Sequence, residues 1–398
     1  MNISIILAAG EGTRMKSKLP KVLHKICGKP LLEYVINASK GAEIEKNVVI
    51  IGHGGEQVKE YFKDEPIIFK EQPIGKDAPY GTGFAVMQGE EYIDDDSDVI
   101  ILCGDTPLIT KETINKLLKF HKEGNFHGTV LTALLADSTG YGRIKRDESG
   151  NIFKIVEEKD ATEEEKKIKE INSGIYCFNG KLLRQALKKI DDDNAQGEFY
   201  ITDVVGILRD EGYKVGAYVV EDSTEIHGIN SRIQLAFSEG IMRKRINETH
   251  MLNGVTFINP DNTYIEEGVV VGSDTIIYPG VNIEGNTKIG EDCIIRSNSR
   301  IVNSQIGDKV EIESSLIEDS IVESSATIGP NAHLRPSSHI GKNVHIGNFV
   351  EVKNSIIEEN SKAGHLAYIG DAIVGKDVNI GCGVIFANYN GKDKQITK

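Results

Sequence analysis

Small residues and cations near the N-terminus form a segment suited to binding nucleotide phosphates. The apolar run Ile3 to Leu7 leads directly into residues 8–12 (AAGEG), and Arg14 and Lys21 follow closely. Small residues let backbone N–H groups approach an anion, and the two cations can neutralise charge that develops during phosphoryl transfer. A strand followed by Gly-x-Gly is often an ordinary turn to a helix, but the flanking cations favour a phosphate site.

Two better-known phosphate loops do not match this segment. A Walker A loop ends in Gly-Lys-Ser or Gly-Lys-Thr, and no such stretch lies near the N-terminus. The dinucleotide-binding fingerprint needs a third small residue where Met15 stands. The segment is therefore interpreted as a phosphate loop of another kind.

The composition limits the class of protein. The 398 residues, 39% hydrophobic and 27% charged, are typical of a folded chain of about two to three domains. The formal charge of −14 argues against nucleic acid as a partner, because binding a phosphate backbone needs a basic surface. We find neither an apolar run long enough for a membrane span nor a leader segment, and expect a cytoplasmic protein without membrane insertion. The five scattered cysteines predict neither a disulfide framework nor a zinc site.

Residues 1–230 alternate apolar runs with helical stretches, which predicts an α/β domain with a mostly parallel sheet. The run 98–103 (DVIILC) predicts a strand buried on both faces, and Asp105 follows its carboxyl end, where open α/β sheets bind ligands. The alternative is that Asp105 is a turn or N-cap residue. The expected strands are 3–7, 47–51, 99–103, 129–134, 171–178 and 215–220, with a helix over 113–122.

Residues 231–251 predict a helical linker. Ile233, Phe237 and Ile241 are spaced four apart, as on one face of a helix. A helix of this length extends roughly 30 Å and can separate two domains.

A period of six marks residues 252–398. Aliphatic residues recur at steps of six, and glycine follows many of them. This period is typical of a left-handed parallel β-helix, in which each short strand buries one aliphatic residue and small residues take the turns. A β-sandwich would instead alternate at every second residue. The two series are Ile265, Val271, Ile277, Ile283, Ile289, Ile295 and Ile301, and Val322, Ile328, Leu334, Ile340, Ile346 and Val352.

With both halves in view, the chain resembles the bifunctional N-acetylglucosamine-1-phosphate uridyltransferase/glucosamine-1-phosphate acetyltransferases. The resemblance implies a Rossmann-like nucleotidyltransferase domain, a linker helix and a β-helix acetyltransferase domain that associates as a homotrimer. The motifs that carry it are 7–10 (LAAG), 104–105 (GD), 140–144 (GYGRI), 155–161 (IVEEKDA), 170–174 (EINSG), 194–200 (NAQGEFY), 228–230 (GIN), 334–336 (LRP), 351–353 (EVK), 361–368 (SKAGHLAY) and 388–389 (NY).

In the first domain the resemblance implies a site for UTP and N-acetylglucosamine-1-phosphate. Asp105 and Asn230 would bind Mg²⁺, which prefers oxygen ligands. Arg14 and Lys21 would stabilise the departing pyrophosphate while the sugar phosphate attacks the α-phosphorus in line. The other substrate-binding residues would be Leu7, Ala8, Ala9, Gly10, Gln72, Gly81, Thr82 and Gly104 for the nucleotide side, and Gly142, Glu157 and Asn172 for the sugar.

In the second domain the resemblance implies acetyl transfer. His365 would take a proton from the amine of glucosamine-1-phosphate as it attacks the thioester of acetyl-CoA, and the ordinary histidine pKa of about 6.5 suits that task. Without the resemblance, His365 would be interpreted as an incidental turn residue. The remaining residues would be Arg335 and Lys353 for the sugar phosphate, Tyr368 and Asn379 for the substrate site, and Cys382, Asn388 and Tyr389 for acetyl-CoA.

Three features differ from the usual pattern of these enzymes. Residues 74–80 lengthen the spacer after Gln72, and Phe84 stands where a histidine is common. Cys382 stands where alanine is usual. The chain ends at Lys398, a few coils before the usual end, which leads us to expect impaired acetyl transfer.

Two other interpretations stay open. A single-function sugar-1-phosphate nucleotidyltransferase would use its β-helix only for regulation or assembly; His365 and its neighbours argue against this, and the early end argues for it. A non-catalytic sugar-nucleotide-binding subunit would not need phosphate-binding cations and a metal pair together. The resemblance therefore implies synthesis of UDP-N-acetylglucosamine, with acetyl transfer, in the cell-wall and lipopolysaccharide precursor pathway.

Overall fold

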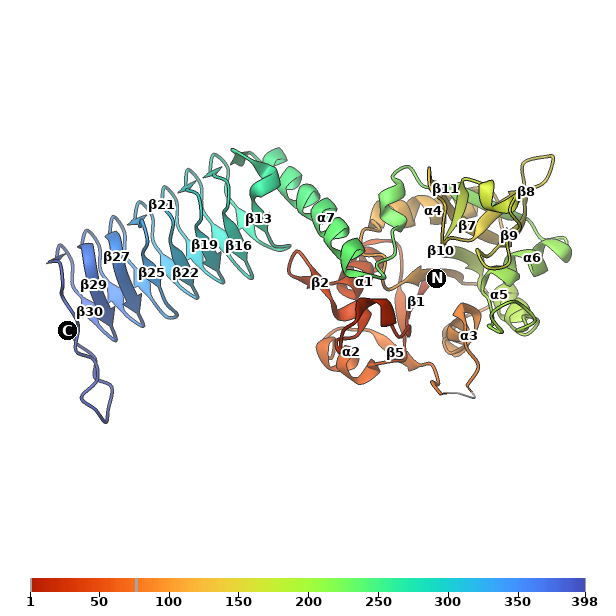
Figure 1. Ribbon diagram of the computed structural model, residues 1–398, viewed down its shortest axis with the longest axis horizontal. Helices are drawn as coiled ribbons and strands as arrows, with labels where there is room; N and C mark the ends of the chain where they lie inside the picture. The colour runs from red at the N-terminus through yellow and green to blue at the C-terminus, as the bar shows by residue number, and fades with distance from the viewer. Residues whose placement is uncertain (1, 76–77, 398) are drawn as a thin grey trace. The chain divides into compact units, whose positions relative to one another are not determined.

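The computed structural model describes residues 2–75 and 78–397. The chain divides into two compact units, Met1–Ser238 and Glu239–Lys398, and the division falls within helix α7 (Arg232–Leu252) (Figure 1). The predicted single helix near residues 231–251 is therefore present. None of the helices in the described ranges is long and apolar enough to cross a membrane.

The first unit is built on a sheet in which strand β1 (Asn2–Ala8) lies near the middle. It pairs in parallel with β4 (Lys46–Ile51) on one side and β6 (Asp98–Cys103) on the other. The strand order is β11-β7-β10-β6-β1-β4-β5, and the sheet is mostly parallel, as predicted. The other strands are β5 (Ile68–Glu71), β7 (Gly128–Leu134), β10 (Glu170–Asn179), β11 (Val215–Val219), the hairpin β8 (Arg143–Arg146) and β9 (Ile152–Val156), and the separate short pair β2 (Lys25–Ile26) and β3 (Lys29–Pro30).

Strand β10 departs from the parallel arrangement. It lies between β6 and β7 and runs antiparallel to both. It also pairs with β8, so the β8–β9 hairpin is attached at this strand. The hairpin was not among the strands expected from the sequence.

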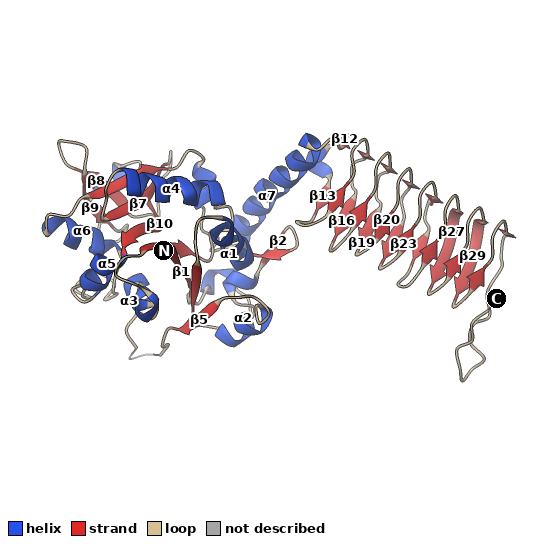
Figure 2. Ribbon diagram, turned by 180° about the vertical axis from the view of Figure 1, so that it is seen from behind, coloured by secondary structure: helices blue, strands red, loops and turns tan. Residues whose placement is uncertain are grey.

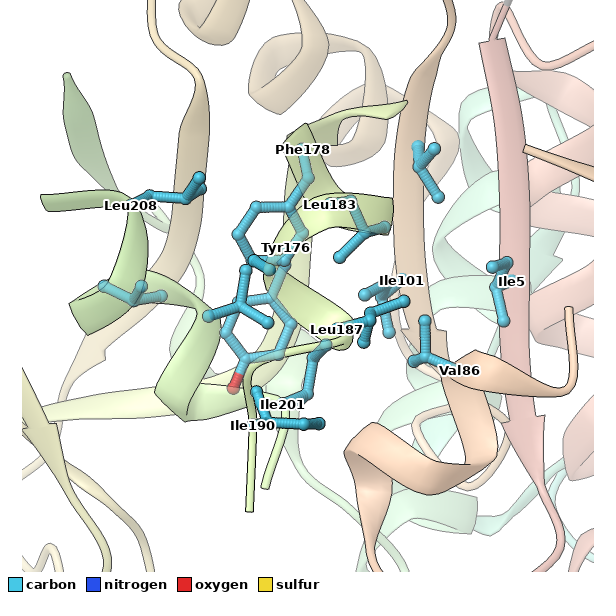
Figure 3. Close-up of a cluster of buried hydrophobic side chains, with 14 of the residues drawn as sticks. Ile5, Val86, Ile101, Tyr176, Phe178, Leu183, Leu187, Ile190, Ile201 and Leu208 are labelled. Carbon is cyan, nitrogen blue, oxygen red and sulfur yellow. The ribbon is translucent and has the colours of Figure 1, made fainter. Parts of the chain in front are cut away.

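Two apolar clusters cover the two faces of the sheet. Alternate residues of β6 belong to different clusters: Val99 and Ile101 to one, and Ile100 and Leu102 to the other. The predicted burial of this strand on both faces is confirmed. Helices α3, α5 and α6 supply the first cluster, part of which Figure 3 shows, and α1, α2 and α4 supply the second; Figure 2 labels these helices. These helices are α1 (Leu31–Gly41), α2 (Gly55–Tyr61), α3 (Thr82–Met87), α4 (Lys111–Glu123), α5 (Gly180–Leu187) and α6 (Thr202–Asp210).

The second unit is a parallel β-helix, as the period of six predicted. Each strand pairs in parallel with the strand one coil later, so Ile277 lies opposite Ile295 and Ile295 opposite Ile312. Every residue of the two predicted aliphatic series is at most 7% exposed. One sheet holds β12 (Thr256–Phe257), β13 (Tyr264–Ile265), β15 (Ile276–Ile277), β16 (Asn282–Glu284), β18 (Ile294–Ile295), β19 (Arg300–Val302), β21 (Glu311–Ile312), β22 (Leu316–Glu318), β24 (Thr327–Ile328), β25 (His333–Leu334), β27 (His345–Lys353), β29 (Lys362–Gly370) and β31 (Asn379–Ile380). The other holds β14 (Val270–Val271), β17 (Lys288–Ile289), β20 (Gln305–Ile306), β23 (Ile321–Val322), β26 (His339–Ile340), β28 (Ile356–Ile357) and β30 (Ile373–Val374).

The turns of the β-helix are taken by small residues of several kinds. Left-handed backbone at the turns is held mainly by asparagine, aspartate and serine, such as Asn298 (φ 60°) and Asn343 (φ 60°), which tolerate this conformation better than most residues. A glycine after an aliphatic residue meets a different need: a Cβ on Gly272 would lie 2.6 Å from the backbone carbon of Gly290. These glycines allow neighbouring coils to approach closely.

The buried stack of aliphatic residues predicts a large difference between two isoleucines of this unit. We expect Ile312→Ala, at a site with no exposure, to lower the free energy of unfolding by about 2–5 kcal/mol. The matched control is Ile321→Ala, at a site 47% exposed, which should cost much less. Denaturant unfolding of both variants tests this, and equal losses would contradict the assigned burial.

Candidate active sites

A cavity of about 250 Å³ lies at the carboxyl ends of β1 and β6. It unites segments far apart in the chain, because both strands run in the same direction and end at the same edge of the sheet. Every residue predicted for the nucleotide side lines it except Gly104, which adjoins two of its lining residues, Cys103 and Asp105. The cavity is lined by Leu7, Ala8, Ala9, Gly10, Lys21, Val22, Gln72, Tyr80, Gly81, Thr82, Ala85, Cys103, Asp105 and Glu198.

Two glycines allow the phosphate loop to fold tightly. Gly12 has φ 64°, and a Cβ there would lie 2.7 Å from Cβ of Lys21. A Cβ on Gly52 would lie 2.8 Å from the carbonyl oxygen of Ala9. With the loop folded in this way, Lys21 lines the cavity. Arg14 is exposed and does not line it.

Lys21, Asp105 and Asn230 come together at one point. The Lys21 ammonium forms an ion pair with the Asp105 carboxylate and donates a hydrogen bond to Asn230 Oδ1 at 3.1 Å. Asp105 is not the N-cap of the following helix: Thr110 caps α4 and accepts the Thr113 N–H at 3.2 Å. Asp105 does lie in a turn, as the alternative interpretation allowed, but the interpretation of it as an N-cap is wrong.

The oxygens of Asp105 and Asn230 form a donor set that fits Mg²⁺. Both contact the same cation, the Lys21 ammonium, so both can reach one positive centre. Carboxylate and amide oxygens are ligands of hard cations, and Mg²⁺ keeps several positions for water and phosphate oxygens. Among the described residues, no group of three or more His, Cys, Asp or Glu side chains is placed to hold a metal ion.

Backbone contacts hold Gln72 and Gly81, which were predicted for the nucleotide side. The Gln72 N–H donates to the Ile51 carbonyl at 2.8 Å, and the Gln72 side chain is buried although residues 74–80 lengthen the spacer after it. Residues 76 and 77 of that spacer lie outside the described residues. Gly81 has φ 122°, and a Cβ there would lie 2.3 Å from the Phe199 carbonyl oxygen. A side chain at position 81 would therefore displace this wall.

The positions next to the cavity floor are also tightly packed. The Gly104 N–H donates to the Leu7 carbonyl at 2.9 Å. Thr82 Oγ1 accepts the Ile201 N–H at 3.2 Å. Phe84, in the place of the usual histidine, lies with its ring centroid 6.4 Å from that of Phe199. Burial raises the pKa of the Cys103 thiol to about 12, which makes it unsuitable as a nucleophile at neutral pH.

Gly142, Glu157 and Asn172, predicted for the sugar, lie together where β8, β9 and β10 meet. The Asn172 N–H donates to the Gly142 carbonyl at 2.8 Å, and a Cβ on Gly142 would lie 3.2 Å from the Glu157 carboxylate. Burial, helped by the nearby carboxylates of Asp160, Asp203 and Glu198, raises the pKa of Glu157 to about 7. A second cavity, of about 340 Å³, is also lined by Glu157, Asp160 and Asp203.

In the second unit, β27 and β29 are nine-residue strands that place candidate residues side by side. Their register sets Asn348 opposite His365 and Glu351 opposite Tyr368. Arg335 pairs with Glu351 at 2.9 Å (Nη1 to Oε1). His365 is exposed, as are Asn379, Cys382 and Tyr389.

The sequence reasoning missed Asp371, which connects several predicted residues. Its carboxylate lies 3.9 Å from Lys353 Nζ and accepts a hydrogen bond from Asn388 Nδ2 at 2.5 Å. Asn388 Nδ2 is also 3.4 Å from the Tyr368 hydroxyl. The pKa of Asp371 is lowered, mainly by the side-chain hydrogen bond from Asn354. The hydrogen bond from Asn388 and the charge of Lys353 add to this effect. Asp371 thus joins Lys353, Tyr368 and Asn388 in one cluster.

Comparison with known families defines the class of protein. The nucleotidyl transferase family matches residues 3–228, the six-repeat bacterial transferase hexapeptide family matches 262–303, and the GMPPB C-terminal domain matches 316–390. The chain is therefore a nucleotidyltransferase followed by a hexapeptide-repeat transferase domain.

Comparison with curated proteins shows the family. Relatives named bifunctional protein GlmU are 56% identical in Clostridioides difficile (98% of this chain, 84% of the relative) and 56% identical in Alkaliphilus oremlandii (99% and 85%). The Enterococcus faecalis relative of the same name is 51% identical (99% and 85%). The chain belongs to the GlmU family of bifunctional proteins, and the resemblance stated from the sequence is confirmed.

The raised pKa of Glu157 predicts the pH dependence of sugar binding. If the ionised carboxylate binds the sugar, kcat/KM for N-acetylglucosamine-1-phosphate should fall as the pH is lowered through about 7, because Glu157 then gains a proton. A pH profile of uridyl transfer tests this. Glu157→Gln should bind the sugar phosphate more weakly and lose the acid limb, whereas the control Glu163→Gln, at an exposed site, should keep it. An unchanged limb in Glu157→Gln would contradict the assignment.

Proposed function

We propose which residues perform the two activities of this bifunctional transferase. The first unit transfers a uridyl group from UTP to N-acetylglucosamine-1-phosphate, and the second transfers acetyl from acetyl-CoA to glucosamine-1-phosphate, in cell-wall precursor synthesis. The observation that carries the first assignment is the meeting of Lys21, Asp105 and Asn230 at a cavity lined by the small-residue loop.

Uridyl transfer needs no protein nucleophile. A phosphate oxygen of the sugar phosphate attacks the α-phosphorus of UTP, and the bond from that phosphorus to the bridging oxygen breaks to release pyrophosphate. Residues 7–10 bind the phosphates through their backbone, and Lys21 neutralises charge on the leaving group. Arg14 is proposed for the same role on a more exposed part of the pyrophosphate.

Asp105 and Asn230 would hold Mg²⁺, which when bound supplies positive charge to the phosphate oxygens. The Lys21 ammonium contacts both of these side chains, so their oxygens already face one positive charge, as they would face a bound metal ion. Glu157, Gly142 and Asn172 orient the N-acetylglucosamine part so that its phosphate faces the nucleotide.

Acetyl transfer is assigned to the strands β27 and β29. His365 accepts a proton from the substrate amine while the amine nitrogen attacks the thioester carbonyl, and the thiol of coenzyme A leaves. Lys353 and Arg335 bind the sugar phosphate. Asp371 contacts both Lys353 and Asn388, and Asn388 in turn contacts Tyr368. Asn379 is proposed to complete the substrate site, and Cys382 and Tyr389, exposed on the last described turns, to contact acetyl-CoA.

A homotrimer is proposed for the second unit. Phe349 and Leu366, on β27 and β29, are 61% and 59% exposed beside the candidate acetyl-transfer residues. Large exposed apolar side chains at such a site are suited to contact with a second copy of the chain.

Substitutions in the two units should separate the two activities. Asp105→Asn should lower uridyl transfer at least about a hundredfold, since several kcal/mol of charge stabilisation is lost. It should leave acetyl transfer unchanged. His365→Ala should lower acetyl transfer by about 10² to 10⁴ and leave uridyl transfer unchanged. Each variant is the control for the other when both half-reactions are assayed separately. Normal uridyl transfer by folded Asp105→Asn would contradict the proposal.

The trimer is tested by light scattering at micromolar concentration. We expect three times the mass of the chain, and we expect Phe349→Asp to shift the protein toward smaller species, because a charge buried at an interface is costly. A monomeric wild-type protein would contradict the proposed trimer.

A further inference from the structure

We propose that Arg143 is a positioning residue for the sugar: its buried guanidinium holds residues 140–142 and Glu158 so that the Glu157 carboxylate faces the N-acetylglucosamine part of the substrate. This inference rests on the proposed function of the first unit. Nothing in the sequence assigned a role to Arg143 beyond its place in the motif 140–144.

The backbone of Arg143 lies at the centre of the sugar site. In the sheet it is the register partner of Val156 in β9 and of Ile171 in β10. The predicted sugar residues are each one position away from this junction: Gly142 precedes Arg143, Glu157 follows Val156, and Asn172 follows Ile171. A shift of Arg143 would therefore move all three.

The side chain of Arg143 fixes the loop that precedes it. Its Nη1 forms an ion pair with Glu158 Oε2 at 2.6 Å and also donates a hydrogen bond to the Tyr141 carbonyl. Glu158 Oε2 in turn accepts the Gly140 N–H at 3.2 Å. One guanidinium thus connects the start of β8 to the residue beside Glu157.

Burying the charged side chain of Arg143 costs folding free energy, which suggests that this residue has a role other than stability. Arg143 is 1% exposed, and its Nε is buried with no hydrogen-bond partner among the described residues. An arginine kept only for stability would be expected to satisfy its donors, because an unpaired buried donor destabilises the fold. The neighbouring Arg146 offers a contrast: it pairs with Glu170 at the surface through Nη2 at 2.6 Å.

The charge of Arg143 also acts on Glu157. Burial and the carboxylates of Asp160, Asp203 and Glu198 raise the pKa of Glu157, and the Arg143 guanidinium opposes them. Loss of this cation should raise that pKa further, so the acid limb of sugar-phosphate use should move to higher pH.

The test compares Arg143→Met with the matched control Arg146→Met from the same strand. For Arg143→Met we expect KM for N-acetylglucosamine-1-phosphate to rise about tenfold, the loss expected when a displaced Glu157 carboxylate no longer makes one charge-assisted hydrogen bond to the sugar. KM for UTP should stay within about twofold of wild type on the same reasoning. The acid limb should shift to higher pH. Arg143→Lys keeps the positive charge but loses the planar set of guanidinium donors. It should raise the KM for the sugar phosphate and shift the acid limb of the pH profile less than Arg143→Met does.

Two results would overturn the proposal. An equal rise in both KM values, or an unmoved acid limb with normal KM, would show a merely structural role for Arg143. If Arg143→Met does not fold, Glu158→Gln decides the matter, because it removes the ion pair and should raise the same KM. Wild-type protein with no uridyl transfer to N-acetylglucosamine-1-phosphate would instead refute the proposed function itself.

Discussion

The parallel register of β1 and β6 is the constraint on which the candidate active site of the first unit depends. Leu7 lies opposite Cys103, so the loop that follows β1 and the aspartate that follows β6 leave the sheet at the same edge. Both faces of β6 are buried, and a slip by one residue would exchange its two apolar faces. Packing of the core therefore fixes the position of Asp105 before any ligand binds.

In the same unit, the carboxylates of Asp105 and Glu157 lie in different electrostatic environments. Asp105 faces the Lys21 ammonium directly. Glu157 is half-buried beside other acidic groups, and the nearby guanidinium of Arg143 forms an ion pair with Glu158. Burial penalises the charged form unless a partner offsets it. One carboxylate is thus suited to a cationic ligand, and the other to accepting hydrogen bonds from an uncharged sugar.

Periodicity made part of this structure predictable. The run 98–103 and the hexapeptide series specify burial directly, because they place apolar residues at regular positions. The direction of β10 was not predictable, since an apolar run does not encode which neighbour a strand pairs with. Strand β8 has the sequence RIKR, with one apolar residue, so no apolar run marked that half of the β8–β9 hairpin. Arg143 and Asp371 contact residues of other segments, and only the fold reveals these contacts.

In the β-helix, residues that are one coil apart in the sequence lie side by side. Because one coil takes 16 to 18 residues, side chains one coil apart become neighbours. Lys353 contacts Asp371 in this way, and Asp371 contacts Asn388 in the next step. The coil also sets Asn348 beside His365. The hydrogen bonds between stacked coils hold these neighbours in register, so the placement of Lys353, Asp371 and His365 follows from the repeat that buries the aliphatic core.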